Sequence, residues 1–211
     1  MPEREFETYF HRRAGRFAAF YSSEPVARIL GRGPLFDRLE LAVDTARSLA
    51  ATRVLDVGCG SGPLFAPLAA QGIHVTGIDP ADAMVALARE QAAVFPSLVE
   101  VEQRGWEAIE EVDAYDLAVA LGVFDYVEDP VALLTRMGRA APHVVGSFPA
   151  PGLRLLLRKV RYGARGVGVH GYRASGFDRL AAGSGLEVAE IHPLGRAGFV
   201  AHFRRKAEPT G

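Results

Sequence analysis

Cysteine, lysine and long apolar runs are scarce in this 211-residue chain, and each absence narrows what the protein can be. The single cysteine, Cys59, excludes an internal disulfide and gives no reason to expect an oxidising compartment. No apolar run approaches the roughly 20 residues that a membrane-spanning helix needs. The N-terminal stretch MPEREFETYFHRR is charged from the start and lacks the apolar core of a signal peptide. We therefore expect a cytoplasmic protein with no integral membrane association.

Net charge is also small. The formal value is −1 at pH 7, so the protein has no overall positive field with which to bind nucleic acid. Lysine occurs only at Lys159 and Lys206, and arginine carries almost all the positive charge. We interpret this as a bias of amino-acid composition and not as a functional feature. The length suits one domain with a substantial core, and no repeat or low-complexity tract divides it.

Apolar strand patterns alternate with helical patterns along most of the chain. Strands are expected at residues 52–57, 73–78, 98–103, 116–121, 143–148, 187–191 and 199–204. Helices are expected at residues 35–49, 63–70, 82–95, 130–140 and 174–182, with a helical turn at 106–111. This alternation predicts an α/β fold with a doubly wound, mostly parallel sheet. The last two strands have no helix between them, which predicts an antiparallel hairpin.

Closely spaced glycines follow the first expected strand in the stretch VLDVGCGSG, residues 54–62. Ligands bind open α/β sheets at the carboxyl ends of the strands. Glycine there lets a ligand approach the main chain with no Cβ in the way. Asp79 ends the second expected strand, where a carboxylate can accept both hydroxyl protons of a ribose. Together these residues predict a nucleoside-containing cofactor.

The spacing of the glycines separates two kinds of cofactor. Nicotinamide folds usually carry G-x-G-x-x-G, whereas this chain has G-x-G-x-G followed by Pro63. Asp56 would also repel a pyrophosphate and would suit a ligand with a positive amino group. The hypothesis of a nicotinamide oxidoreductase therefore rests only on the shared glycine loop.

VLDVGCGSG, with the following VTGIDPADAMVALA, resembles the first two motifs of class I S-adenosylmethionine-dependent methyltransferases. YDLAVALGVFDYVEDP resembles their fourth-strand motif, and GSGLEVAEI with GFVAHFRR resembles their closing hairpin. The resemblance implies a Rossmann-like seven-stranded sheet with an antiparallel last strand and S-adenosylmethionine across the ends of strands one, two and four. It divides the single domain into a helical cap (1–50), a cofactor-binding core (51–148), a substrate-side insert (149–173) and a final helix with a hairpin (174–206).

The resemblance also implies a role for each matching residue. Gly58 and Gly60 would let the methionine part of the cofactor pass close to the main chain. Asp56 would hold its ammonium group, and Asp79 the ribose hydroxyls. Pro80 and Met84 would lie against the adenine. Leu121 and Gly122 would supply main-chain contacts beside the methionine part.

Two aromatic residues complete the expected cofactor site. The family often has an acidic residue after the third strand, where this chain has QRGW, so Trp106 is expected either to stack on the adenine or to pack. The N-terminal segment EFETYFHRRAGRFAAFY resembles the lid helices of small-molecule members. Tyr21 is the residue there that we expect to face the cofactor, with simple packing as the alternative.

Transfer of a sulfonium methyl is an in-line displacement that needs positioning and, for some acceptors, a base. Asp125 and Tyr126 follow the fourth strand, and His170 lies in the insert; these are the catalytic candidates, with a solvated loop histidine as the alternative for His170. Substrate contacts are expected from Phe124, Tyr172 and Arg158. No metal ligands are expected.

The insert contains GLRLLLRKVRYGARG, with leucines on one helical face and arginines on the other. Three interpretations stay open: a solvated basic face, a lid for an anionic acceptor, or a helix on a membrane surface or acidic carrier. In outline the insert resembles the corresponding region of tetrapyrrole O-methyltransferases, without naming a substrate.

We expect a methyltransferase that acts on a small-molecule acceptor, at oxygen rather than nitrogen or carbon. Nucleic-acid base methylation is not expected, because GVFDY stands where base-modifying enzymes usually carry an Asn- or Asp-Pro-Pro-aromatic motif. The alternative is a non-catalytic or regulatory S-adenosylmethionine-binding protein, since no residue is an unambiguous base.

Overall fold

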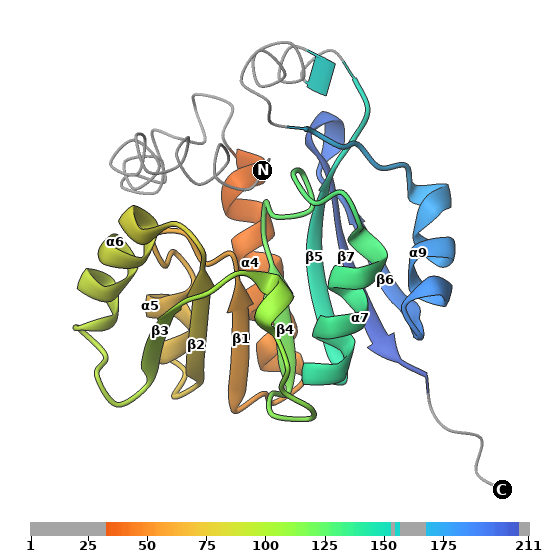
Figure 1. The fold of residues 1–211 in the computed structure, drawn as a ribbon. Coiled ribbons are helices and arrows are strands. Elements are labelled where there is room, and N and C mark those ends of the chain that lie inside the picture. The colour runs from red at the N-terminus through yellow and green to blue at the C-terminus, as the bar shows by residue number, and fades with distance from the viewer. Residues whose placement is uncertain (1–32, 153–154, 157–167, 207–211) are drawn as a thin grey trace, which may run out of the picture.

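The computed structural model describes residues 33–152, 155–156 and 168–206. Its centre is one seven-stranded sheet with the strand order β3-β2-β1-β4-β5-β7-β6 (Figure 1). The strands are β1 Arg53–Val57, β2 His74–Asp79, β3 Val99–Gln103, β4 Leu117–Ala120, β5 His143–Pro149, β6 Leu186–Pro193 and β7 Gly198–Arg205. Strands β1 to β5 are parallel, and β7 is antiparallel to both of its neighbours. The predicted fold class and the antiparallel hairpin are therefore confirmed.

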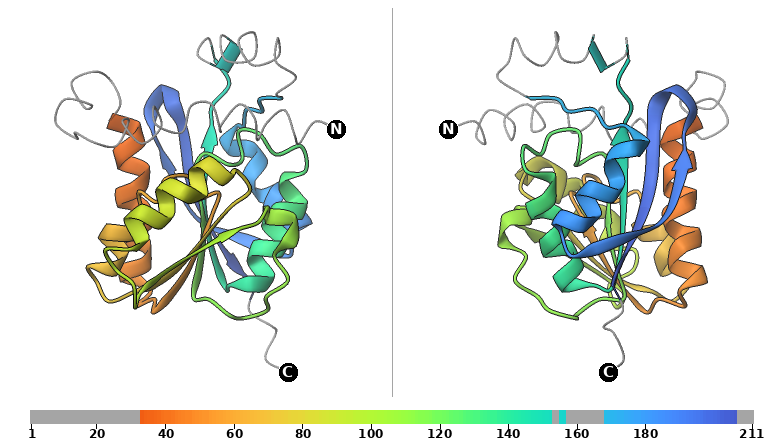
Figure 2. Two further views of the ribbon diagram at one scale, coloured as in Figure 1. Left: turned by 60° about the vertical axis from the view of Figure 1, so that its left-hand side comes forward. Right: turned by 90° about the vertical axis from the view of Figure 1, so that its right-hand side faces the viewer.

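Helices cover both faces of the sheet. The described helices are α4 Gly33–Ser48, α5 Phe65–Ala69, α6 Asp82–Ala92, α7 Pro130–Ala140 and α9 Phe177–Gly183, with 3₁₀ turns η2 Trp106–Ala108, η3 Ala174–Gly176 and η4 Gly195–Ala197. Figure 2 shows α4 on one side of the β6–β7 hairpin and α9 on the other. Among the helices of the described ranges, none combines the length and apolar character needed to cross a bilayer.

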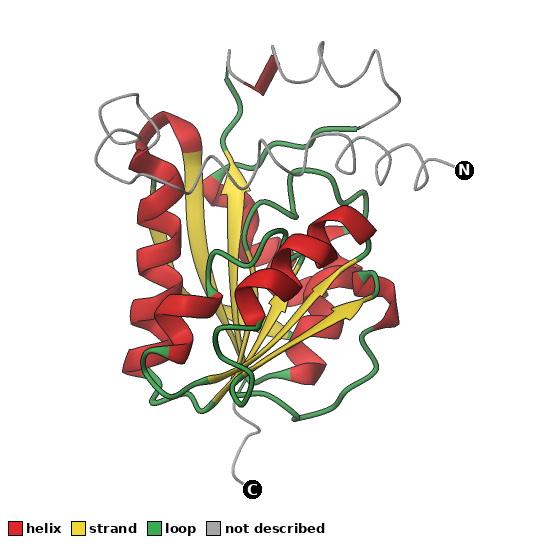
Figure 3. Ribbon diagram, turned by 90° about the vertical axis from the view of Figure 1, so that its left-hand side faces the viewer, coloured by secondary structure: helices red, strands yellow, loops and turns green. Residues whose placement is uncertain are grey.

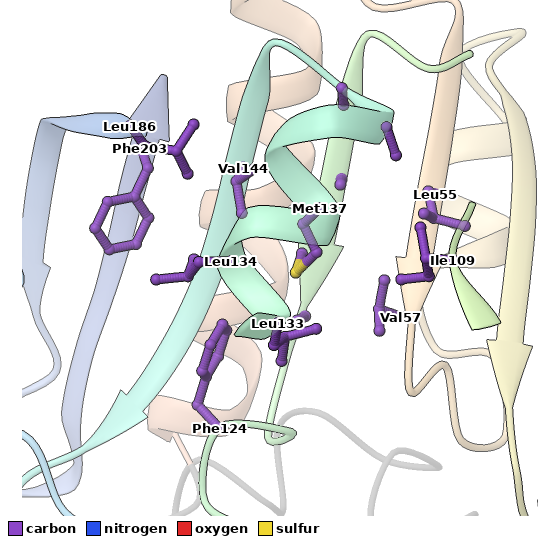
Figure 4. Packing of buried hydrophobic residues seen from close by; sticks show 14 of the residues in the cluster. Leu55, Val57, Ile109, Phe124, Leu133, Leu134, Met137, Val144, Leu186 and Phe203 are labelled. Carbon is purple, nitrogen blue, oxygen red and sulfur yellow. The ribbon is translucent and has the colours of Figure 1, made fainter. Parts of the chain in front are cut away.

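Helix α7 shows how local sequence sets an element. Its side chain cap is Asp129, which accepts the N–H of Ala132 at 2.9 Å, and Pro130 occupies the first turn, where its missing N–H costs nothing. Leu133, Leu134 and Met137 share one face and are fully buried against the sheet (Figure 4). The helix spans the residues 130–140 that the sequence predicted, because cap and apolar face agree.

Strand β4 is shorter than predicted, and side chains explain its start. The Asp116 carboxylate accepts the main-chain N–H groups of Thr52 at 2.7 Å and Arg53 at 2.9 Å. It thereby joins the segments that enter β4 and β1, in addition to the hydrogen bond from the main-chain N–H of Asp116 to the carbonyl of Arg53 at 2.9 Å. The predicted helix 174–182 is likewise divided into η3 and α9.

Two histidines meet near the amino end of β5, far from the glycine loop. Nδ1 of His143 and Nε2 of His202 lie 3.1 Å apart, across β5 and β7. Burial lowers the pKa of both rings, and the charges of Arg204 and, for His202, His143 add to the effect. The pKa of His202 falls to about 4, with Glu190 acting in the opposite direction. One proton between two neutral rings satisfies the contact, so the fold favours the neutral pair.

We predict that acidification destabilises the protein partly through this pair. An unfolded histidine has a pKa of about 6.5, and His202 in the fold has one of about 4. Between these values the unfolded chain binds the extra proton, so unfolding becomes more favourable as pH falls. Acidification to about pH 5.5 lowers the free energy of unfolding, and His202→Gln should remove up to about 1 kcal/mol of this decrease. This value allows for partial exposure of the ring. Urea unfolding near neutral pH and near pH ~5.5 measures this; equal losses in both proteins would contradict it.

Candidate functional site

The loops that follow the parallel strands gather at one end of the sheet, as the green segments in Figure 3 show. There the glycine loop after β1 is tied to the end of β2 by two hydrogen bonds. The N–H of Cys59 donates to the carbonyl of Ile78, and the N–H of Gly60 donates to Oδ2 of Asp79, each at 3.0 Å. The predicted cofactor residues of β1 and β2 therefore lie together.

The two glycines of this loop differ in what surrounds them. Both have positive φ, +66° at Gly58 and +56° at Gly60. A Cβ at Gly58 would lie 2.4 Å from Cγ2 of Val123, so the close neighbour is a protein side chain after β4. A Cβ at Gly60 would meet no heavy atom within 4 Å among the described residues. The open space that a ligand needs is therefore beside Gly60.

Asp79 uses both carboxylate oxygens on main chain. Oδ2 accepts the N–H of Gly60, and Oδ1 accepts the N–H of Ala81 at 2.9 Å. Burial raises the pKa of this carboxyl, although the two N–H donors act to lower it. Each oxygen keeps a further lone-pair position, so a ribose diol can be bound without breaking either bond.

Asp56 is a buried acid with an unfilled hydrogen-bonding position. It is 3% exposed, and its Oδ2 has no hydrogen-bond partner in the part of the chain that the structure describes. Burial, together with the charge of Asp79, raises its pKa to about 7. Burial also raises the pKa of the adjacent Cys59 thiol, which argues against a reactive thiolate. An unpaired buried carboxylate is costly, and a cationic amino group would satisfy it.

Arg38 lies next to the candidate site, and the sequence did not predict it there. It lies on α4, and a Cβ at Gly122 would be 3.2 Å from its Nη1. The guanidinium therefore lies directly over the turn that follows β4. A planar guanidinium is suited to bidentate binding of a carboxylate. No local pattern could have found this contact, because α4 and the β4 turn are far apart in the sequence.

Phe124, predicted to contact substrate, is placed in the core. The residue is 0% exposed and lies near Leu133 of α7 (Figure 4). Its ring stacks on that of Phe148, with the ring centroids 4.3 Å apart. A Cβ at Gly146 would lie 2.7 Å from this ring, so the glycine makes room for it. In this arrangement the ring has no surface left for a ligand, and it anchors the β4 turn instead.

The insert returns to the same turn and brings the predicted acceptor-side residues together. The N–H of His170 donates to the carbonyl of Asp125 at 2.8 Å, and the Tyr172 hydroxyl donates to the carbonyl of Phe124 at 3.0 Å. Burial, and then the charge of Asp125, raises the pKa of Tyr172. Nε2 of His170 is buried and has no partner among the described residues. Tyr126 is half-buried, and its N–H donates to the carbonyl of Val123 at 2.9 Å.

The other predicted site residues are distributed as follows. Met84 is buried beside Ala81, whereas Pro80 is half-buried at the end of β2. Trp106 is half-buried and packs against the core cluster beneath α7. Tyr21 and Arg158, with most of the arginine-rich stretch 152–166, lie outside the described residues. Within the described ranges, no group of three or more His, Cys, Asp or Glu side chains is arranged to hold a metal.

Comparison with known proteins gives one family. The profile described as "Methyltransferase domain" matches residues 9–191. The ubiquinone biosynthesis O-methyltransferase of Rhodopseudomonas palustris (strain BisA53) is 30% identical over 122 residues, which are 58% of this chain and 48% of that protein. The enzyme of the same name from Bordetella avium (strain 197N) is 39% identical over 97 residues, 44% and 39% of the two chains. The chain thus spans about half the length or less of these curated relatives.

Solved structures share the fold at low sequence identity. Magnesium protoporphyrin IX methyltransferase (ChlM) from Synechocystis PCC 6803 with bound SAH has a TM-score of 0.78 at 20% identity, covering 97% of this chain and 100% of that one. The O-methyltransferase NcsB1 from neocarzinostatin biosynthesis, in complex with S-adenosyl-L-homocysteine and 1,4-dihydroxy-2-naphthoic acid, has a TM-score of 0.62 at 22% identity, covering 90% and 61%. Both likenesses concern the fold alone.

We predict that S-adenosylhomocysteine binding releases a proton near neutral pH. Asp56 is partly protonated there because its pKa is about 7, and an ammonium group beside it favours the charged carboxylate. Affinity should therefore rise between about pH 6 and about pH 8. Calorimetry in buffers of different ionisation enthalpy measures the proton release. Asp56→Asn should bind more weakly and release no proton; proton release by the variant equal to that of the wild type would contradict this assignment.

Proposed function

The chain belongs to the Methyltransferase domain family, among the class I S-adenosylmethionine-dependent methyltransferases, and from this premise we propose that it methylates a small-molecule acceptor at oxygen. The observation that carries the proposal is the junction of β1 and β2. There the Asp79 carboxylate holds Gly60 beside space that is open among the described residues. Oδ2 of Asp56, near the end of β1, has no hydrogen-bond partner in the same part of the chain. S-adenosylmethionine, when bound, supplies a methyl group that its sulfonium sulfur has already activated.

The described residues fit this cofactor. Asp79 would accept the ribose hydroxyls, and Asp56 would accept the ammonium of the methionine part. Arg38, over Gly122, would bind the methionine carboxylate in the same region. Pro80 and Met84 would lie against the adenine, and Leu121 would lie beside the methionine part.

The acceptor side is proposed at the β4 turn and the returning insert. His170, through Nε2, would take the hydroxyl proton as the acceptor oxygen bonds to the methyl carbon and the carbon–sulfur bond breaks. Asp125, whose main-chain carbonyl accepts the main-chain N–H of His170, and Tyr126 are the neighbouring alternative bases. The names of the relatives from ubiquinone biosynthesis support an oxygen acceptor.

The remaining expectations follow from the same residues. We propose a cytoplasmic location, supported by the lone buried Cys59. A nucleic-acid substrate stays outside the proposal, because the net charge is −1 and the β4 turn lacks a base-modifying motif. No observation favours the non-catalytic alternative over methyl transfer.

Binding of S-adenosylhomocysteine by calorimetry tests the cofactor half of the proposal. We expect Asp79→Asn to weaken binding about tenfold or more, because the amide would place N–H groups against a main-chain N–H and offer fewer acceptors to the ribose. Asp116→Asn is the matched control. Asp116 also accepts two main-chain N–H groups, at the opposite end of the strands, so this variant should lower Tm and keep the affinity. Absence of wild-type binding at millimolar ligand would overturn the proposal.

An assay of methyl transfer to a soluble catechol tests the acceptor half of the proposal. The measured quantity is the amount of methylated product. His170→Gln keeps a polar side chain but offers no base. We expect kcat to fall about 10²-fold while the affinity for S-adenosylhomocysteine is unchanged. Wild-type kcat in the variant would remove His170 from the reaction and leave the carboxylate of Asp125 as the candidate.

A further inference from the structure

One side chain of β5 reaches across to the turn after β4. Oγ of Ser147 accepts the N–H of Gly122 at 2.8 Å. The last residues paired between the two strands are Ala120 and Gly146, so the chain of β4 leaves the sheet just before this bond. The serine hydroxyl therefore replaces the next step of the strand ladder with a side-chain acceptor.

The position of Ser147 makes a polar side chain unexpected for packing alone. It is 5% exposed, on the face of β5 that also carries the fully buried Val145, and it pairs with buried Val200 of β7. Alanine or valine would fill such a position without a hydroxyl to satisfy. A buried hydroxyl is costly unless it is hydrogen-bonded. The N–H of Gly122 supplies the hydrogen bond, so the reason for a serine lies in the turn.

What this bond controls is the main chain next to the guanidinium of Arg38. A Cβ at Gly122 would lie 3.2 Å from Nη1 of Arg38, so a small shift of this turn changes the distance between the two. On the other side, Val123 packs within 2.4 Å of a Cβ placed at Gly58. The turn is thus enclosed between the glycine loop and α4, and Ser147 holds it from β5.

We propose that Ser147 is a positioning residue for the methionine part of the cofactor. By holding the N–H of Gly122, it keeps the main chain of Leu121 and Gly122 in place as one wall of that part of the site, opposite the ribose contact at Asp79. This inference rests on the proposed function, because it assigns Ser147 to the same cofactor site.

Two ligands separate this role from general stability. S-adenosylhomocysteine has the amino-acid part, and 5′-methylthioadenosine lacks it but keeps the nucleoside. We expect Ser147→Ala to weaken binding of the first about tenfold, the order of one hydrogen bond to a positioned group. Binding of 5′-methylthioadenosine should change by less than about twofold, because Asp79 and the adenine contacts stay in place.

Ser184→Ala is the matched control. Ser184 is a second buried serine, and its hydroxyl donates to the carbonyls of Leu180 and Ala181 at the end of α9. This variant should lower Tm and leave the affinity for both ligands unchanged. If Ser147→Ala does not fold, as judged by circular dichroism, Ser147→Cys takes its place. Its sulfur is somewhat larger than the oxygen and a weaker acceptor, so the same selective loss is expected.

Equal weakening of both ligands by the Ser147 variant, or no weakening of S-adenosylhomocysteine, would overturn the inference. Failure of the wild-type protein to bind S-adenosylhomocysteine is a different result, which contradicts the proposed function itself. A loss of affinity in Ser184→Ala as large as that in the Ser147 variant would show a general effect of stability and would also overturn the role.

Discussion

The carboxylate of Asp79 is the interaction on which the proposed site depends. It joins the N–H of Gly60 in the loop after β1 to the N–H of Ala81 at the start of α6, and so connects two crossovers of the sheet. A charged acceptor bound by two main-chain donors is stronger than a neutral one and can be buried at lower cost. This group therefore holds the glycine loop against β2, and in the proposed function it would also accept the ribose hydroxyls.

The charged side chains around the proposed site suit a zwitterionic amino-acid group. Asp56 and Asp79 are both buried, and the charge of Asp79 adds to the cost of ionising Asp56. Arg38 approaches from α4 on the other side of the turn after β4. An ammonium next to the acids and a carboxylate next to the guanidinium would each be stabilised more than in water, because the surroundings are poorly solvated. The same burial explains why Asp56 titrates near neutrality.

The turn after β4 joins the cofactor side of the site to the acceptor side. Its middle is anchored by Phe124, whose ring lies among the buried aromatic residues under α7. Ser147 holds its beginning, and Tyr172 from the insert holds the carbonyl of Phe124. Asp125 follows directly, so its position is set by groups from three separate segments. Precise placement of this kind is what an in-line displacement requires.

The sequence alone predicted the order of strands and helices, the glycine loop, and the positions of Asp56 and Asp79. Each of these features depends on neighbours along the chain or on a local pattern. Helix α7 was predicted to the residue for the same reason. Only the tertiary structure decided that Val123 fills the space beside Gly58, that Phe124 belongs to the core, and that Arg38 and Ser147 meet at Gly122. These contacts join segments that are distant in sequence, and their geometry follows from how the sheet is ordered and twisted, which no local periodicity encodes.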